Sequence, residues 1–296
     1  MRILLSAFLA LACLACSPAS DAPPGMTNGG PALWRIRDAD SEFWLFGSVH
    51  VLPPDLEWQS SAVRAAFASA EEFITETDMR DAAGAELAQL MQRYGTLPAG
   101  EQLSDLLTPA EAARLSRVLQ RLGVDRRPLE GARPWLAALQ LSYAHAARAG
   151  HSVEAGVESV LMREAQARGM RFSFLETPET QIRILADLSP EAQRALLVNT
   201  IGEIEEGEDG MRELDAAWAR GDTASMARLL DAEWRKAGTE VHEAVILRRN
   251  RAWVEDIVRR LEGSGTLFIA VGAAHLVGDG NVVALLRARG IAVEGP

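Results

Sequence analysis

The sequence predicts an α/β fold in which a central mixed or parallel β-sheet carries large helical insertions. Two stretches near opposite ends of the chain share one plan, an apolar run followed by a glycine, two further residues and a histidine: EFWLFGSVHVLPP at 42–54 and TLFIAVGAAHLVGDG at 266–280. Short apolar runs bounded by glycine are typical of buried strands. Residues 81–168 and 178–262 instead follow helical spacing, so long helical segments separate the strands.

The N-terminal end predicts export. A single Arg2 precedes an apolar run that is too short for a stable membrane anchor and is typical of a secretory signal. We expect residues 1–16 to be the signal peptide and residues 17–31 to be a flexible tether. Cys16 is a candidate for lipidation, which would make the protein a membrane-anchored lipoprotein. Cys13 stands where a lipoprotein signal has an aliphatic residue, so ordinary cleavage and a periplasmic location are the alternative.

Composition limits the partners of the remaining chain. The formal net charge is -11, and Lys236 is the only lysine, so we expect no binding to nucleic acid. Contact with a membrane is expected only through the N-terminal lipid. Both cysteines lie in the predicted signal, so the mature protein would fold without disulfides. Residues 32–296 are long enough for a sizeable core, and we predict a single domain that is strand-rich at 32–80, 170–176 and 265–296.

The first strands form a predicted hairpin. Residues 33–37 alternate apolar and charged side chains, and residues 38–41 supply a turn. The apolar residues 43–46 then lead into Gly47, where the backbone is expected to turn tightly. His50 therefore lies just past the carboxyl end of the first core strand.

Two further strands end in carboxylates. A helix is predicted over residues 60–70, followed by a short strand that finishes at Glu76 and Asp78. A later strand, residues 171–175, ends at Glu176. Glu76 and Asp78 have a simpler interpretation as solvated loop charges.

The helical regions carry recognisable start and stop signals. Thr108 and Glu111 form a capping box, and Gly123 is the expected stop of that helix. An amphipathic helix is predicted over 156–168, and a long helix over 241–261 precedes the second glycine-to-histidine strand. His145 and His151 belong to the helical layer and its exit loop, and we expect core or surface positions for both. The chain closes with a predicted helix at 282–289 and a short strand at 291–293.

Four predicted strands thus end in His50, Glu76, Glu176 and His275. If these strands are parallel, their carboxyl ends meet at one edge of the sheet, where ligands of open α/β sheets collect. Two imidazoles with one or two carboxylates suit a divalent ion such as zinc, manganese or cobalt. Such an ion activates water, and a spare glutamate can act as general base, which is the chemistry of amide or ester hydrolysis. The alternative is that each histidine is only a hydrogen-bonded core residue.

Several ordered motifs resemble the TraB/PrgY/GumN family. They are Leu33-Trp34, Gly47-Ser48-Val49-His50, Arg133-Pro134-Trp135, Leu175-Glu176-Thr177 with Gln181, Arg249-Asn250 with Trp253, and Gly272-Ala273-Ala274-His275-Leu276. The resemblance implies an α/β core like that of the erythromycin-esterase and ChaN folds. Members related to the Tiki proteins are metal-dependent proteases, whereas pheromone-shutdown members are thought of as binding peptides. One departure is Glu158, where relatives usually have aspartate.

The resemblance marks His50, Glu76 and His275 as the core of the site, with Glu176 and Arg249 as supporting groups. We therefore expect an exported or lipid-anchored metal-dependent hydrolase acting on a peptide or a small related amide. His50, Glu76 and His275 would bind the ion, Glu176 or Glu76 would act as base, and Arg249 would stabilise the oxyanion. The alternative function is a non-catalytic protein that binds or sequesters peptides on the same scaffold.

Overall fold

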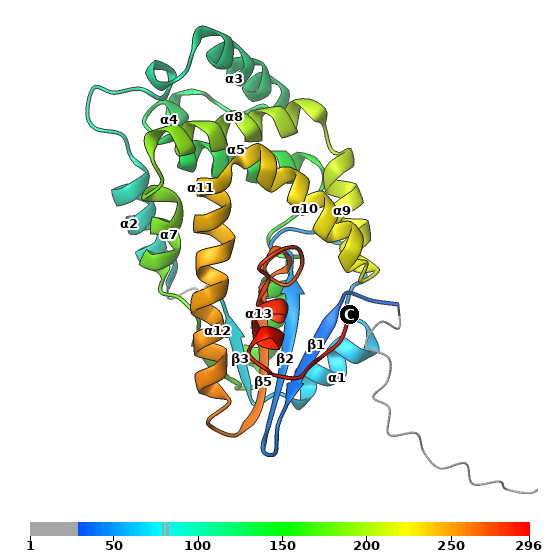
Figure 1. Ribbon diagram of the computed structural model, residues 1–296. Helices are drawn as coiled ribbons and strands as arrows, with labels where there is room; N and C mark the ends of the chain where they lie inside the picture. The colour runs from blue at the N-terminus through cyan, green and yellow to red at the C-terminus, as the bar shows by residue number, and fades with distance from the viewer. Residues whose placement is uncertain (1–28, 79, 81–82) are drawn as a thin grey trace, which may run out of the picture.

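The computed structural model describes residues 29–296 except residues 79, 81 and 82 (Figure 1). The predicted signal peptide, Cys16 and most of the predicted tether lie outside the described residues. Within the described part of the chain, none of the helices combines the length and apolar character needed to cross a membrane.

The described residues form one mixed sheet, which confirms the predicted α/β fold class. Its strands are β1 (Leu33–Arg37), β2 (Ser41–Ser48), β3 (Glu72–Thr75), β4 (Arg171–Phe174), β5 (Gly265–Gly272) and β6 (Val293–Glu294). Their order across the sheet is β4-β3-β5-β2-β1-β6. The four strands β4, β3, β5 and β2 are parallel, and β1 runs antiparallel to both β2 and β6. The carboxyl ends of the four parallel strands therefore share one edge.

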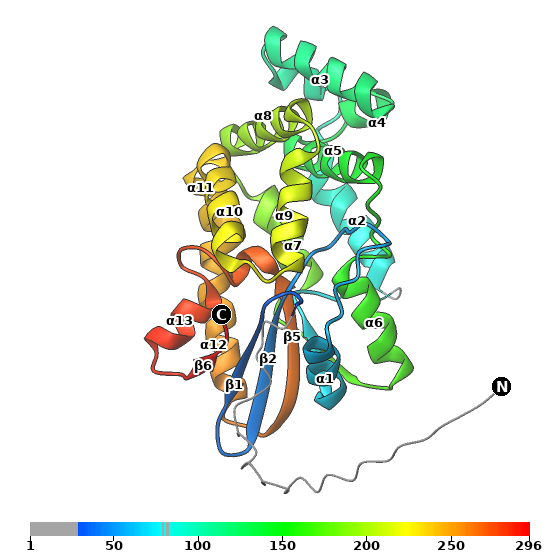
Figure 2. The same ribbon diagram turned by 90° about the vertical axis from the view of Figure 1, so that its right-hand side faces the viewer.

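Helices cover both faces of the sheet and gather beyond that edge. The helices are α1 (Ser61–Ser69), α2 (Gly84–Gly95), α3 (Pro109–Leu122), α4 (Arg127–Glu130), α5 (Pro134–Arg148), α6 (Val157–Ala167), α7 (Pro178–Ala186), α8 (Pro190–Glu206), α9 (Asp209–Ala219), α10 (Thr223–Ala237), α11 (Thr239–His242), α12 (Arg248–Arg260) and α13 (Val282–Ala288). Shorter turns are η2 (Leu103–Leu106) and η4 (Ala273–His275), both 3₁₀, and the π-helical η3 (Glu243–Leu247). Helices α1 and α6 lie on one side of the sheet, and α12 and α13 lie on the other (Figure 2). Most of the remaining helices lie past the carboxyl ends of the parallel strands (Figure 1).

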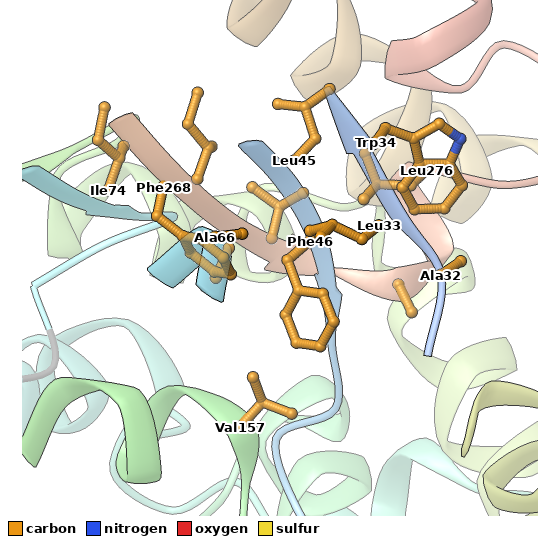
Figure 3. Packing of buried hydrophobic residues seen from close by; sticks show 14 of the residues in the cluster. Ala32, Leu33, Trp34, Leu45, Phe46, Ala66, Ile74, Val157, Phe268 and Leu276 are labelled. Carbon is orange, nitrogen blue, oxygen red and sulfur yellow. The ribbon is translucent and has the colours of Figure 1, made fainter. Parts of the chain in front are cut away.

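The alternation of side chains along the strands builds the core. Figure 3 shows Phe46 pointing toward Val157 of α6, whereas its neighbour Leu45 points to the opposite side of the sheet. Phe46 and Phe268 belong to the adjacent strands β2 and β5, and their ring centroids lie 5.8 Å apart. The Phe67 ring of α1 meets Phe268 edge to face at 5.1 Å. Aromatic pairs of this kind contribute about 0.5–1.5 kcal/mol each beyond the burial of their area.

Local signals in the sequence predicted several elements well. The hairpin of β1 and β2 is confirmed with Leu33 paired to Phe46. The capping box is confirmed, since the Thr108 N–H donates to Glu111 Oε2 at 2.8 Å and Thr108 Oγ1 accepts from the Glu111 N–H at 3.3 Å. Gly123 adopts the left-handed conformation at φ 69°, which ends α3 as expected.

Two elements differ from the prediction. The predicted helix over 241–261 is interrupted by the π-helical η3, directly before Arg249 and its neighbours on α12. Such π-helical segments occur frequently at functional sites, and helical periodicity in the sequence does not distinguish them from a continuous α-helix. The last strand lies at Val293–Glu294 instead of 291–293, because pairing with β1 sets its bounds.

Candidate functional site

The ends of β3 and β4 bring two of the predicted carboxylates together. Glu76 follows β3 directly, and Glu176 lies two residues after β4. The Glu176 backbone N–H donates to the Glu76 carbonyl oxygen at 2.8 Å, so the parallel pairing of the strands continues past their formal ends. The two glutamates thus lie side by side at the carboxyl edge of the sheet.

Glu76 is buried and has partners on both carboxylate oxygens. Its Oε2 accepts from Arg249 Nη2 at 2.5 Å and from Gln181 Nε2 at 3.1 Å, and its Oε1 accepts from the Gly272 N–H at 2.7 Å. Burial alone would raise the pKa of Glu76, but the Arg249 cation, His275, His50 and the Gly272 N–H together lower this pKa to about 2. The carboxylate is therefore ionised at neutral pH.

Arg249 lies at the centre of the cluster and uses every N–H of its guanidinium. Nε donates to Glu176 Oε1 at 2.9 Å, and Nη2 donates to Glu176 Oε2 at 3.0 Å as well as to Glu76. Nη1 donates to the Val245 carbonyl at 3.3 Å and lies 3.0 Å from His275 Nε2. An arginine has five N–H donors, and all five have partners here. The predicted oxyanion role would therefore require one of these contacts to be released.

His275 is held as a neutral ring. Asn250 Nδ2 donates to the Gly280 carbonyl at 2.9 Å, which turns Asn250 Oδ1 toward His275 Nδ1 at 2.6 Å. Nδ1 consequently carries the proton, and Nε2 offers a lone pair to Arg249. Burial, together with the Arg249 cation, lowers the pKa of His275 to about 3.

His50 is the exposed member of the set. Its Nδ1 lies 2.7 Å from Glu158 Oε1, and its side chain is 48% exposed whereas that of Glu158 is 4% exposed. Ser48 Oγ donates to the same Glu158 oxygen at 2.5 Å. The Glu158 carboxylate contributes most to raising the pKa of His50 to about 9, with a smaller contribution from Glu76, against partial desolvation of the ring and the Arg249 cation. A buried carboxylate thus orients an accessible imidazole within electrostatic reach of Glu76 and Arg249.

The loop that carries His50 is held by the segment before α6. The Val157 N–H donates to the Val49 carbonyl at 3.0 Å, and Leu52 and Ser152 exchange backbone hydrogen bonds. A Cβ atom added at Gly156 would lie 2.0 Å from the His50 carbonyl oxygen. Only a glycine therefore allows these two segments to approach so closely.

We expect Gly156→Ala to destabilise the protein by about 1–3 kcal/mol, because the His50 backbone must shift to relieve the clash. Chemical denaturation measures the free energy of unfolding. The matched control is Gly131→Ala, where an added Cβ would meet no atom within 4 Å. Equal stability of both variants would contradict the close approach at Gly156.

We expect Glu158→Gln to lower the pKa of His50 from about 9 toward its ordinary value of 6.5, since the carboxylate that contributes most to raising this pKa is removed. NMR titration of the His50 ring measures the change. Glu164→Gln is the control on the same helix, because Glu164 bonds Gln59 away from the site. An unchanged pKa of His50 in Glu158→Gln would refute the pairing.

The predicted ligands His50, Glu76 and His275 only partly match a metal site. Both rings engage Nδ1 with an oxygen atom, as metal-binding histidines do when Nε2 faces the ion. However, Arg249 already occupies His275 Nε2, which lies 3.8 Å from Glu76 Oε1. Among the residues that the structure describes, no group of three or more His, Cys, Asp or Glu side chains is placed to hold one ion. The three residues as arranged do not fit a divalent ion, and the metal dependence expected from the sequence stays a prediction.

A cavity of about 460 Å³ opens beside the cluster, between α7 and the segment formed by η3 and α12. Glu176 and Arg249 lie in its wall together with Arg248, which is exposed. Apolar side chains such as Ile184 and Leu188 alternate there with charged ones. The cavity has room for a short stretch of peptide next to the buried charges.

Sequence reasoning assigned no role to Glu158, Asn250 or Gln181, although each holds a member of the cluster. A signal for Glu158 exists in the sequence. It shares one helical face with Leu161 and Met162, and a carboxylate on such an apolar face needs a buried partner. His151 lies in the loop after α5, as predicted, and pairs with Asp215 at 2.7 Å, away from the cluster of Arg249.

Comparison with known proteins supports the family resemblance that the sequence motifs indicated. The model of the TraB/PrgY/gumN family matches residues 32–295. YbaP of Escherichia coli (strain K12) is 23% identical over 257 residues, which cover 87% of this chain and 92% of YbaP. YbaP of Shigella flexneri is 24% identical over 243 residues, which cover 82% of this chain and 87% of that relative. No solved structure gives a significant match. Since the family match spans nearly all of the described chain, this protein belongs to the TraB/PrgY/gumN family.

Proposed function

We propose that this protein is a hydrolase that cleaves an amide or ester bond, with peptides as its substrate class. One observation carries the proposal: the half-exposed His50 ring is oriented by the buried Glu158 carboxylate at 2.7 Å, next to a buried cluster of charges. A histidine fixed at Nδ1 by a carboxylate presents Nε2 for proton transfer. Family membership supports the same reaction class by analogy.

The geometry favours His50 over the two glutamates as the acid–base group. Both Glu76 and Glu176 are held by Arg249, and Trp253 Nε1 also donates to Glu176 at 3.0 Å. The His50 side chain, in contrast, is 48% exposed. In its neutral form His50 accepts a proton from the attacking water, and it then donates this proton to the leaving group.

The raised pKa of His50 sets the expected pH dependence. A pKa of about 9 means that the ring is mostly protonated at neutral pH, so the fraction able to act as base grows as the pH rises. We expect kcat/KM to increase from neutral pH toward about pH 9. A fall of kcat/KM over this range would assign His50 a role as proton donor only.

The remaining parts of the proposal come from the sequence and from the cavity. The cavity beside Arg249 and Glu176 offers both charged and apolar walls, which suits a peptide. We propose that the protein acts after export, in the periplasm or at the outer membrane through a lipid on Cys16. The net charge of -11 argues against nucleic acid as the substrate.

The experiment that tests the proposal is a cleavage screen with the purified full-length chain. Peptide and ester libraries are incubated between about pH 6 and 10, with and without zinc, manganese or cobalt, and the products are identified by mass spectrometry. We expect defined cleavage products whose rate of formation rises with pH. Binding of peptides without any cleavage under all conditions would favour the sequestering function instead.

A further inference from the structure

We infer that the guanidinium of Arg249 takes the place of a divalent cation at the carboxyl edge of this sheet, so that the site functions without a bound metal ion. The inference concerns the cation of the site and holds whether or not the reaction is hydrolysis. The sequence predicted a metal ion at this edge of the sheet, whereas the structure has the Arg249 guanidinium there, in contact with the predicted ligands Glu76 and His275.

The guanidinium contacts the groups that an ion would need. Arg249 Nη2 lies 2.5 Å from Glu76 Oε2, and Nη1 lies 3.0 Å from His275 Nε2. Both Glu176 oxygens accept from the same side chain, at 2.9 and 3.0 Å. A divalent ion would bind these same oxygen and nitrogen lone pairs, and two cations at one set of lone pairs repel each other.

The protein holds Arg249 in this position from its other sides. The Val245 carbonyl of the π-helical η3 accepts from Nη1 at 3.3 Å, and the guanidinium lies over the Trp253 ring at 4.5 Å from its centroid. The Arg249 side chain is only 9% exposed. To admit an ion, the protein would have to give up five hydrogen bonds and move a buried charge. With Arg249 in place, no three His, Cys, Asp or Glu side chains of the described residues are arranged to hold one ion.

Ion content tests the inference without reference to activity. The full-length chain, made without a chelating tag, is equilibrated with zinc, manganese or cobalt, dialysed and measured by plasma mass spectrometry. We expect far less than one ion per wild-type chain. We expect Arg249→Ala to gain cobalt close to one ion per chain, with visible absorption bands of the bound ion, because Glu76, Glu176 and His275 lose their cation. Arg248→Ala, a change at the exposed neighbour, should remain free of metal.

The outcomes separate clearly. A wild-type chain that retains about one ion, and loses it in His275→Asn, would overturn the inference. A folded Arg249→Ala variant that binds no ion would overturn it as well, since no cation position would then exist.

If Arg249→Ala fails to fold, Arg249→Met keeps the packing of the stem and takes its place in the cobalt measurement. Restoration of the fold of Arg249→Ala by cobalt or by guanidinium ions would support the inference. Cleavage activity in the metal-free wild type is scored separately, so failure of the hydrolase proposal remains distinguishable.

Discussion

His50→Asn is expected to lower kcat/KM for peptide or ester cleavage by about 10²–10⁴-fold, the usual contribution of a general acid–base group. The reason is the position of His50, whose ring is 48% exposed and fixed through Nδ1 by Glu158. Asparagine is smaller and has no group that takes up a proton near neutral pH. The fold should survive, because the side chain lies at the surface and not in the core. Cleavage rates measured across the pH range provide the test.

The control for this prediction is another histidine of the chain. His242 lies on α11, where its ring stacks on Trp234 at 5.3 Å, outside the cluster of Arg249. His242→Asn should keep the wild-type rate. The rise of kcat/KM toward about pH 9 should vanish in His50→Asn and should move to lower pH in Glu158→Gln. Full activity of His50→Asn would refute the assigned role.

Arg249→Ala is expected to lower the free energy of unfolding by about 3–5 kcal/mol, the typical effect of removing one partner from a buried ion pair. The change leaves the buried carboxylates of Glu76 and Glu176 without their shared cation. At roughly 2–4 °C per kcal/mol, the melting temperature should fall by about 6–20 °C. Differential scanning calorimetry and denaturant titration measure both quantities.

The loss of stability in Arg249→Ala should depend on pH, and its sign follows from the pKa of Glu76. In the wild type, the folded-state pKa of Glu76 is about 2 and lies below its ordinary value of 4.5. Its ionised form therefore adds stability above about pH 4.5, and this contribution disappears as the pH falls toward 2. Arg249→Ala lacks most of that contribution at every pH. The stability curves of wild type and variant should consequently approach each other in acid.

Two other arginine variants complete the experiment. Arg248→Ala changes an exposed neighbour whose side chain makes no hydrogen bond or ion pair among the described residues, and its effect should stay within about 0.5 kcal/mol. Arg249→Lys keeps one positive charge but cannot bind two carboxylates through a planar fork, so we expect partial recovery. A loss below about 1 kcal/mol in Arg249→Ala would mean that the cluster is not held by this cation.

Local features of the sequence determined most of the elements. The apolar run from residues 43 to 46 predicted β2, although the strand continues through Gly47 to Ser48 instead of turning at the glycine. Thr108 with Glu111 predicted the start of α3. The capping residues and the apolar periodicity act over a few neighbouring positions, so they can be read without the rest of the chain. The boundary between η3 and α12 was not predictable in this way, since a π-helical turn keeps nearly the same pattern of apolar residues.

The α/β fold class, the family and the polar residues at the ends of the parallel strands were predictable from the sequence, because apolar runs and the residues that follow them are local signals. Which side chains pair with each other depends on the packing of distant segments. Arg249 meets Glu76 across 173 positions of the chain, and His50 meets Glu158 because α6 packs beside the loop after β2. These contacts depend on how helices far along the chain lie against the sheet, and the periodicity of a segment carries no information about its distant partners. The packing thereby placed an arginine where the residue types alone had predicted a metal ion.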